Sequence, residues 1–328
     1  MRIGFTYDAR ADYLKLGFTE DQVAEFDADR TIDTIARTLA ELGHQVDRIG
    51  HAKALCERLV KGDRWELVFN IAEGVHGRNR EAQVPAILDL YGIPCTFSDA
   101  LVCAVTLDKA VAKRIVHACG LRTPAFAVLE NAAAAATVKL PFPLFAKPIA
   151  EGTGKGVDAR SMIRTRSELE AVCADLLAKY HQPVLVEEFL PGREFTTAIV
   201  GTGAEARAIG SMEILIHDKT GSGIYSYENK ENCEAFCKYE RLAPGTLRSE
   251  VEALAVACYR ALECRDAGRV DIRLDADGRP SFMEVNPLAG LNPGHSDLPM
   301  IAEMEGMPYR ELLRAILDSA TRRISQPG

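Results

Sequence analysis

The sequence predicts an α/β protein with an N-terminal open parallel lobe and two further lobes. A chain of 328 residues exceeds one ordinary hydrophobic core, so we expect two or three domains. Strands and helices alternate through the first hundred residues, which is typical of a parallel sheet. A glycine-rich loop follows a later strand, and an acidic hairpin lies near the C-terminus. We expect lobes at residues 1–98, 99–186 and 187–328.

The first lobe shows clear periodic patterns. MRIGFTY at the start predicts a strand, and an acidic, partly irregular segment follows it to Asp29. Ile32, Ile35, Leu39 and Leu42 recur at helical spacing, and Gly43 ends that helix. ELVFNI predicts a buried strand, and EAQVPAILDLYGIP a helix. These elements favour an open parallel α/β unit.

The later elements indicate two more sheets. One uninterrupted amphipathic helix is expected at residues 99–120. Further strands are predicted for PLFAKPI, PVLVEEFL, GREFTTAIVG and EARAIGSMEILI, the last two in a mixed sheet, with a helix at TRSELEAVCADLLAKY. The polar, glycine-containing stretch at 217–234 is a candidate active-site lid.

Composition excludes several classes of protein. The net charge is −8 and no block of Lys and Arg stands out, so nucleic acid is not expected as a partner. The N-terminus lacks the apolar region of a signal peptide, and we expect no membrane span. Nine scattered cysteines without a C-x-x-C pair indicate reduced thiols in a cytoplasmic enzyme.

The stretch LFAKPIAEGTGKGVDA delivers Lys147 at the end of a strand, followed by three glycines. It does not match the P-loop, because Lys155 is followed by glycine, and it lacks the third glycine of G-x-G-x-x-G. A phosphate-binding loop and a simple turn both fit this composition.

The hairpin RVDIRLDADGRPSFMEVN favours the phosphate interpretation. Alternation places Asp271 on the face opposite Val270 and Ile272, and Gly278 supplies the turn. If Leu274 pairs with Arg279, then Asp271 faces Phe282, and Glu284 and Asn286 lie on the same side as Asp271.

A solvated edge hairpin would also carry acids. However, the residues around Glu284 are apolar, and a lone buried carboxylate is costly. Two carboxylates and an amide oxygen suit Mg²⁺, which is also coordinated by phosphate oxygens of a bound substrate. Magnesium beside a lysine and glycine loop indicates a nucleoside triphosphate.

From about residue 65 onward the chain resembles the ATP-grasp enzymes, and most closely the D-alanine–D-alanine ligase family. The motifs that carry the resemblance are HG with a following Glu81, LYGIPCTFSDAL, LDKAVAK, FAKP…EG, VEEFLPGREFT, YSYENK, GRVDIRLD and MEVNPLAGLNPGHS. The resemblance implies an ATP-grasp fold in which two lobes sandwich the nucleotide. It also implies an ADP-forming ligase that joins two amino acids through an acyl phosphate, as in peptidoglycan synthesis.

The resemblance also implies roles for individual residues. Those for ATP would be Lys109, Lys147, Gly152, Gly154 and the lid residue Lys230, with Glu187, Glu188, Phe189 and Leu190 at the adenine and Glu194 at the ribose. Asp271, Glu284 and Asn286 would bind two Mg²⁺ ions, with Mn²⁺ as an alternative. The oxyanion would be stabilised by Arg269 and the Gly290 N–H, Ser296 would hold the attacking amino acid, and Thr153 and His76 would lie near the substrate. A homodimer is expected by the same resemblance.

Departures from the family pattern gather around the first substrate. The glycine-rich N-terminal segment is absent, which leaves Glu25 as the candidate for orienting the first amino acid, with Asp27 as a rival. NREA follows the His-Gly pair where GEDG is usual, and Glu231 stands where the lid carries a tyrosine. These differences predict a polar or cationic first substrate. A ligase for another carboxylate remains an alternative, as does a non-catalytic nucleotide-binding protein, although paired metal ligands argue against the latter.

Overall fold

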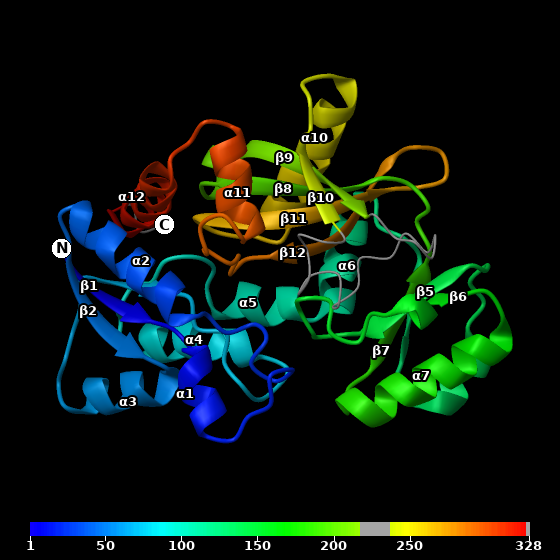
Figure 1. Ribbon diagram of the computed structural model, residues 1–328, viewed down its shortest axis with the longest axis horizontal. Helices are drawn as coiled ribbons and strands as arrows, with labels where there is room; N and C mark the ends of the chain where they lie inside the picture. The colour runs from blue at the N-terminus through cyan, green and yellow to red at the C-terminus, as the bar shows by residue number, and fades with distance from the viewer. Residues whose placement is uncertain (217–236, 326–328) are drawn as a thin grey trace.

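The computed structural model describes residues 1–216 and 237–325. Within these residues the chain forms three sheets (Figure 1), and the second of them includes a strand, Val184–Glu188, that crosses the lobe boundary expected at residues 186 and 187. The lobe boundaries themselves stay a prediction. The second and third sheets face each other across the candidate site.

The N-terminal sheet is parallel, as predicted. Its order is β2-β1-β3, and both neighbours pair with β1 in parallel. The strands are β1 (Arg2–Thr6), β2 (Gln45–Gly50) and β3 (Leu67–Asn70), and the helices are α1 (Arg10–Lys15), α2 (Asp29–Glu41), α3 (Ala52–Val60) and α4 (Gln83–Leu90). The periodic residues Ile35 and Leu39 of α2 are fully buried. Periodicity therefore located the core face of this helix.

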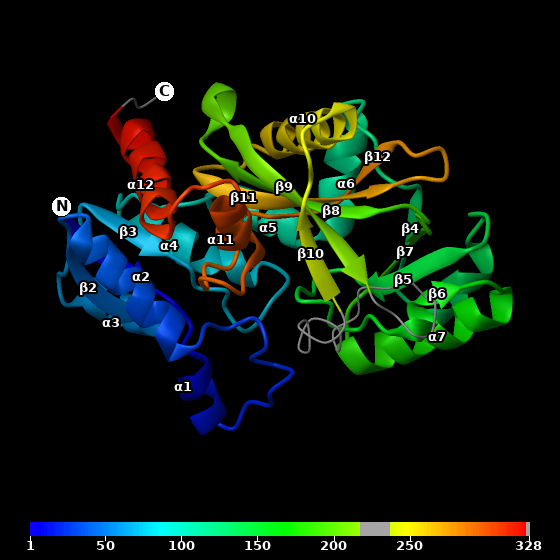
Figure 2. The same cartoon turned by 45° about the horizontal axis from the view of Figure 1, so that its top comes forward.

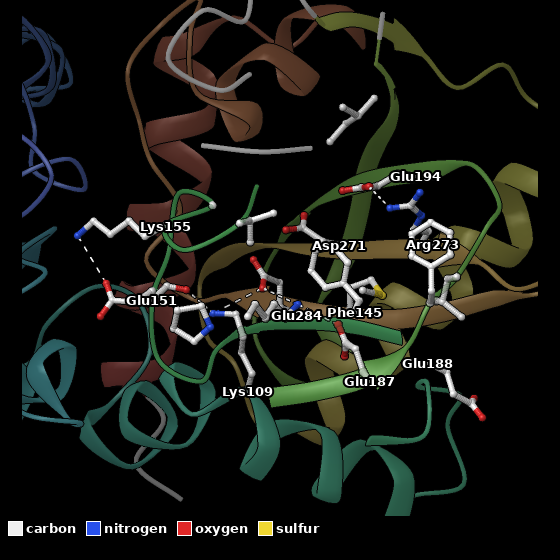
Figure 3. Close-up of a pocket in the computed structure, with 18 of the residues that line it drawn as sticks. Lys109, Phe145, Glu151, Lys155, Glu187, Glu188, Glu194, Asp271, Arg273 and Glu284 are labelled. Carbon is white, nitrogen blue, oxygen red and sulfur yellow. Dashed lines mark hydrogen bonds and ion pairs between the residues drawn. The ribbon is translucent and has the colours of Figure 1, made fainter. Parts of the chain in front are cut away.

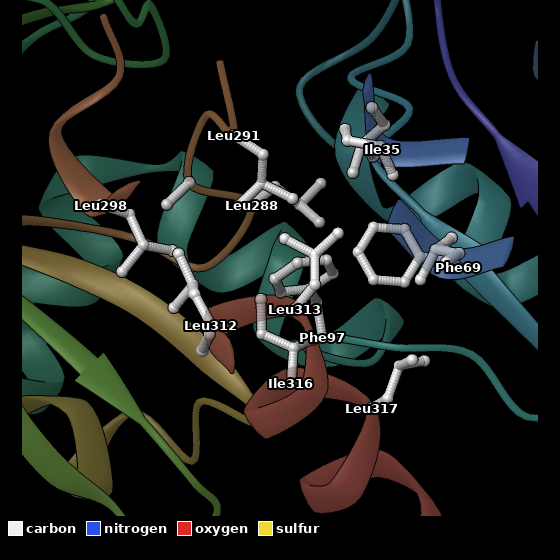
Figure 4. Close-up of a cluster of buried hydrophobic side chains, with 14 of the residues drawn as sticks. Ile35, Phe69, Phe97, Leu288, Leu291, Leu298, Leu312, Leu313, Ile316 and Leu317 are labelled. Atoms are coloured by element: carbon white, nitrogen blue, oxygen red, sulfur yellow. The ribbon is translucent and has the colours of Figure 1, made fainter. Parts of the chain in front are cut away.

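The C-terminal helix α12 (Tyr309–Ser325) packs on the N-terminal lobe, so the two ends of the chain share one core. Figures 1 and 2 both place α12 beside α2. Leu313 and Ile316 of α12 lie near Phe69 and Phe97 in that core (Figure 4). The same cluster includes residues of α11 (Asp297–Met304). This core ties the N-terminal lobe to the C-terminal sheet.

The second sheet has the order β4-β7-β5-β6, and its neighbouring strands are antiparallel. The strands are β4 (Phe126–Leu129), β5 (Leu144–Pro148), β6 (Met162–Ile163) and β7 (Val184–Glu188). Helix α7 (Arg166–Tyr180) covers one face through Leu169 and Cys173. The strands β5 and β7 lead directly into the residues predicted to bind the nucleotide.

The third sheet has the order β10-β9-β8-β11-β12 and is antiparallel, so the expectation of a mixed sheet was wrong. Its strands are β8 (Glu194–Val200), β9 (Arg207–Ile216), β10 (Cys237–Arg241), β11 (Ala267–Leu274) and β12 (Pro280–Asn286). Helix α10 (Thr246–Ala261) covers the face that carries Ile199, and α11 covers the face that carries Ala198 and Val200. Side chains therefore alternate between two cores along β8.

The helix expected at 99–120 is broken at Asp108. It forms α5 (Ala100–Leu107) and α6 (Lys109–Ala118), and Asp108 between them is extended, with ψ of 98°. The Asp108 carboxylate accepts the N–H groups of Ala110 and Val111, both at 3.1 Å, and so caps α6. The break places Lys109 in the first turn of α6, where its side chain reaches Glu151.

The hairpin register differs from the prediction by one residue at the turn. Leu274 pairs with Pro280 and not Arg279, and Phe282 lies opposite Ile272 in the hydrophobic core. Between Asp271 and Ile272 the pairing shifts at a bulge in which Met283 is the extra residue of β12, so that Asp271 lies opposite Glu284. The predicted convergence of the two carboxylates is confirmed, but the bulge produces it, because regular pairing from Ile272–Phe282 would set Asp271 opposite Met283.

Candidate active site

The nucleotide pocket lies between the second and third sheets (Figure 3). Phe145, Leu190, Ile214 and Met283 supply apolar surface to it. The residues predicted for ATP that line it are Lys109, Lys147, Gly154, Glu187, Glu188, Phe189, Leu190 and Glu194, whereas Gly152 lines an adjoining cavity. Arg273 donates to Glu194 at 3.2 Å and stacks over the Phe189 ring at 5.2 Å. The pocket thus combines an apolar slot with charged ends, as a nucleotide requires.

Glu187 lies between two ammonium groups. It is fully buried, and its carboxylate is 2.9 Å from Lys113 Nζ and 3.2 Å from Lys147 Nζ. Burial raises the pKa of Glu187, but the two lysines outweigh burial and lower it. Burial alone would lower the pKa of Lys147, yet Glu187 and Glu284 raise it, so this lysine stays charged. Burial lowers the pKa of Lys113, with Glu187 opposing the shift.

The glycine loop needs unusual backbone angles. Thr153, Gly154 and Gly156 have φ of +50°, +75° and +76°. At Gly152 the requirement is steric, because a Cβ there would lie 2.6 Å from Glu25 Oε1. Lys155 is buried with its Nζ 3.6 Å from Glu151. The loop is therefore held close against the N-terminal lobe.

The three predicted metal ligands converge on adjacent strands. Asp271 lies opposite Glu284, and Asn286 lies opposite Arg269 with its Nδ2 3.5 Å from Asp271 Oδ2. Glu284 Oε2 is 3.6 Å from Lys109 Nζ and 3.8 Å from Lys147 Nζ. Among the described residues no cluster of three or more His, Cys, Asp or Glu is placed to hold a metal ion. Two carboxylates and an amide oxygen fit Mg²⁺, which completes its shell with water and phosphate oxygens.

A second cavity adjoins the nucleotide pocket. It is lined on one side by Arg269, Gly290 and Ser296, and on the other by Thr153 and acidic residues of the N-terminal lobe. Lys109, Glu151, Arg269 and Glu284 line both cavities. The two cavities therefore meet at the lysine, the arginine and one candidate metal ligand.

Arg269 and the loop after β12 form one wall of the second cavity. Arg269 donates to Asp297 and, at 3.3 Å, to Asp271. Ser296 Oγ accepts the N–H of Asn292 at 3.1 Å. A Cβ at Gly290 would lie 2.7 Å from Ser296 Oγ, so glycine lets the backbone approach this hydroxyl.

The N-terminal lobe supplies the opposite wall, where Glu25 is already engaged. Its Oε1 accepts the Gly152 N–H at 2.7 Å, and its Oε2 accepts from Arg80 at 2.9 Å. Arg80 also donates to the Ala150 carbonyl at 2.8 Å. Burial raises the pKa of Glu25, but Arg80 and Lys155 outweigh burial and lower it. Both oxygens of Glu25 thus tie the glycine loop to the N-terminal lobe.

Asp27, the rival of Glu25, lines the same cavity without a donor from the described part of the chain to its carboxylate. Burial and the nearby Asp8 raise the pKa of Asp27 to about 7. Burial and Glu25 raise the pKa of Glu81 to about 7 against the opposing Arg80. Burial and Glu81 raise the pKa of Glu73 well above its usual range. This wall disfavours further negative charge.

Asp27→Asn should stabilise the protein, and it should do so more strongly at pH 8 than at pH 5. The folded pKa of Asp27 exceeds that of the unfolded chain, so this group stabilises the fold below about pH 4 and loses the contribution as the pH rises through 7. The gain at pH 8 should exceed the gain at pH 5 by roughly 2–3 kcal/mol, since about two pH units separate pH 5 from the folded pKa of about 7. Thermal unfolding at both pH values measures it, with the exposed Asp12→Asn on the same segment as control. Equal effects of Asp27→Asn at the two pH values would contradict the raised pKa.

Some predicted residues lie elsewhere. His76 is exposed, lines neither of the two cavities, and has its ring 6.3 Å from that of Phe18. Lys230 and Glu231, with the candidate lid, lie outside the described residues. Their roles stay predictions.

Sequence reasoning assigned no role to three buried basic residues, Arg80, Lys113 and Lys155. Arg80 lies in the NREA segment that departs from the family pattern, and its position next to Glu81 was the one feature that could have drawn attention to it. Lys113 lies one helical turn after Lys109, on the same helix. The ion-pair partner of Arg80 is Glu25, and that of Lys113 is Glu187. Neither pair could be predicted, because its two residues are distant in sequence.

The fold and the paired cavities define an ATP-grasp enzyme. The sequence profile described as "D-ala D-ala ligase C-terminus" matches residues 115–318. The D-alanine–D-alanine ligase of Bordetella petrii is 38% identical over 260 residues, 77% of this chain and 76% of the relative. The chain belongs to the D-alanine–D-alanine ligase family.

Two solved structures share the fold. The D-alanine–D-alanine ligase of Bacillus anthracis, complexed with ATP, superposes with a TM-score of 0.75 at 23% identity over the full length of both chains. The VanG D-Ala:D-Ser ligase of Enterococcus faecalis gives 0.73 at 20% identity, over 97% of this chain and 99% of that one. No helix in the described ranges is long and apolar enough to cross a membrane. The seven cysteines whose side chains are described are free thiols.

Proposed function

We propose that this protein is an ADP-forming ligase that joins the carboxylate of one amino acid to the amine of another. The observation that carries the proposal is the junction of the two cavities at Lys109, Arg269 and Glu284. A phosphoryl donor on one side and an acceptor on the other would react there. Membership of the family supports the same reaction class.

ATP fits the first pocket by its chemistry. The apolar slot would take the adenine, Glu194 would accept from the ribose, and Lys109 and Lys147 would contact the phosphates. Asp271, Glu284 and Asn286 would hold two Mg²⁺ ions, or Mn²⁺ in their place. Bound metal would neutralise charge on the transferring phosphoryl group.

The second cavity fits the amino acids. The first carboxylate would attack the γ-phosphorus, which releases ADP and forms an acyl phosphate. The amine of the second amino acid, held by its carboxylate at Ser296, would then displace phosphate. Arg269 and the Gly290 N–H would stabilise the oxyanion of the tetrahedral intermediate that forms when the amine attacks the acyl phosphate. We further propose a homodimer, as the family resemblance implies.

The first substrate is the finer question, and D-alanine is the default. The wall formed by Asp27, Glu73 and Glu81 carries raised pKa values, and a cationic group placed against it would offset the crowded negative charge. A D-amino acid with a polar or cationic side chain therefore fits better than D-alanine alone. Asp27 is favoured over Glu25 for the amino group, because both Glu25 oxygens are engaged.

ADP release over a panel of D- and L-amino acids tests the function. We expect ADP release with at least one pair of amino acids, and higher kcat/KM with a cationic first substrate than with D-alanine. Asp27→Asn should lower the ratio of kcat/KM for the cationic substrate to kcat/KM for D-alanine, whereas Asp12→Asn should leave this ratio unchanged. No ADP release across the panel would contradict ligase function. Efficient D-alanyl-D-alanine synthesis that is insensitive to Asp27→Asn would restore D-alanine as the substrate.

A further inference from the structure

Lys113 is a fully buried lysine that lines neither the nucleotide pocket nor the second cavity. Its ammonium lies 2.9 Å from Glu187 Oε2, 3.1 Å from Thr123 Oγ1 and 3.3 Å from the Phe282 carbonyl. An ammonium has three donors, and three acceptors from separate elements surround this one. A buried charge is retained only with such compensation.

The carboxylate of Glu187 is shared between two lysines. One oxygen faces Lys113, and the other faces Lys147, which lines the nucleotide pocket. Glu284 lies 3.8 Å from Lys147 and 3.6 Å from Lys109, so this group contains three ammonium groups and two carboxylates, with a net charge of +1. Without Lys113 the charges of the group would cancel.

We propose that Lys113 is a positioning residue for the triphosphate, because it occupies Glu187 and so leaves the charge of Lys147 available to the phosphates. The proposal rests on the proposed function, in which Lys147 contacts ATP. Lys113 itself touches no part of the nucleotide space. Its effect on the phosphates would pass through Lys147, whereas any effect on the adenine contact expected of Glu187 would appear in AMP binding as well.

A purely structural role for Lys113 makes a different prediction. Lys113 joins α6 to β7 and β12, so its loss could simply destabilise the fold. Such a loss would affect the affinity of every nucleotide alike. AMP and ATP share adenosine, so the ratio of their dissociation constants isolates the contribution of the outer phosphates.

Isothermal titration with AMP and with Mg²⁺–ATP supplies that ratio. For Lys113→Met we expect ATP to bind about tenfold more weakly, with the AMP affinity within about twofold of the wild type. Thr123→Val is the matched control, because it removes a neutral partner of the same ammonium. It should lower Tm while leaving the ratio of AMP to ATP dissociation constants unchanged.

The double variant Lys113→Met/Glu187→Gln restores the net charge of +1, since Lys109, Lys147 and Glu284 remain. It also leaves no lone buried carboxylate, so it guards against misfolding of the single variant. We expect the ratio to return toward the wild-type value. An unchanged ratio in Lys113→Met, or equal shifts in Lys113→Met and Thr123→Val, would overturn the proposal while leaving the ligase function intact. A wild-type protein that binds AMP as tightly as ATP would overturn both.

Discussion

Glu284→Gln and Asp271→Asn should each lower ADP formation by about 10³-fold or more at saturating Mg²⁺ and ATP. The two carboxylates lie opposite each other on β11 and β12, and each substitution removes one negative charge with little change in volume. Glu284 also lies within 4 Å of Lys109 and Lys147, so its charge positions the lysines proposed to contact the phosphates. Steady-state ADP release measures the loss.

The matched control lies in the same hairpin. Asp277→Asn removes an exposed carboxylate from the turn and should leave turnover unchanged. Circular dichroism should show the native fold in all three variants. Retained turnover in Glu284→Gln and Asp271→Asn would mean that the hairpin does not form the metal site.

Arg269→Met should lower kcat by about 10²- to 10³-fold while changing the KM for ATP little. Arg269 lines both cavities and lies where charge would develop on the tetrahedral intermediate. Arg269→Lys keeps the charge but loses the planar fork, so kcat should fall by a smaller factor. Rapid-quench measurement of ADP and dipeptide tests both variants.

For Arg269, a catalytic role and a structural role are distinguished by whether kcat or the KM for ATP changes. Because Arg269 also donates to Asp271 and Asp297, a purely structural role would lower Tm and raise KM for ATP. A fall in kcat with unchanged KM excludes that explanation. Unchanged kcat in Arg269→Met would place oxyanion stabilisation on other groups.

The fold could be predicted well where patterns are local. Periodicity identified the buried face of α2, and alternation identified the face of β11 that carries Asp271. Periodicity predicted one helix through Asp108, but the Asp108 carboxylate caps a new helix there and so interrupts the helical pattern. The prediction also failed at the bulge of β12, since the position of an extra residue depends on tertiary packing of Phe282.

The site divides in the same way. Residues in contiguous motifs, such as Lys109, Lys147 and Glu284, come together around one pocket, as the resemblance implied. The engagement of Glu25 by Arg80 and Gly152 could not be predicted, because three segments distant in sequence meet there. Burial, which raises the pKa of Asp27, is likewise a property of the folded chain alone.

Transfer of ¹⁸O from the first amino acid to phosphate tests the central claim most directly. If the carboxylate attacks the γ-phosphorus, one carboxylate oxygen must leave with inorganic phosphate when the amine displaces it. With a ¹⁸O-carboxylate substrate, mass spectrometry should therefore show one ¹⁸O in each phosphate released during dipeptide formation. Unlabelled phosphate, or release of AMP and pyrophosphate in place of ADP, would contradict activation through an acyl phosphate.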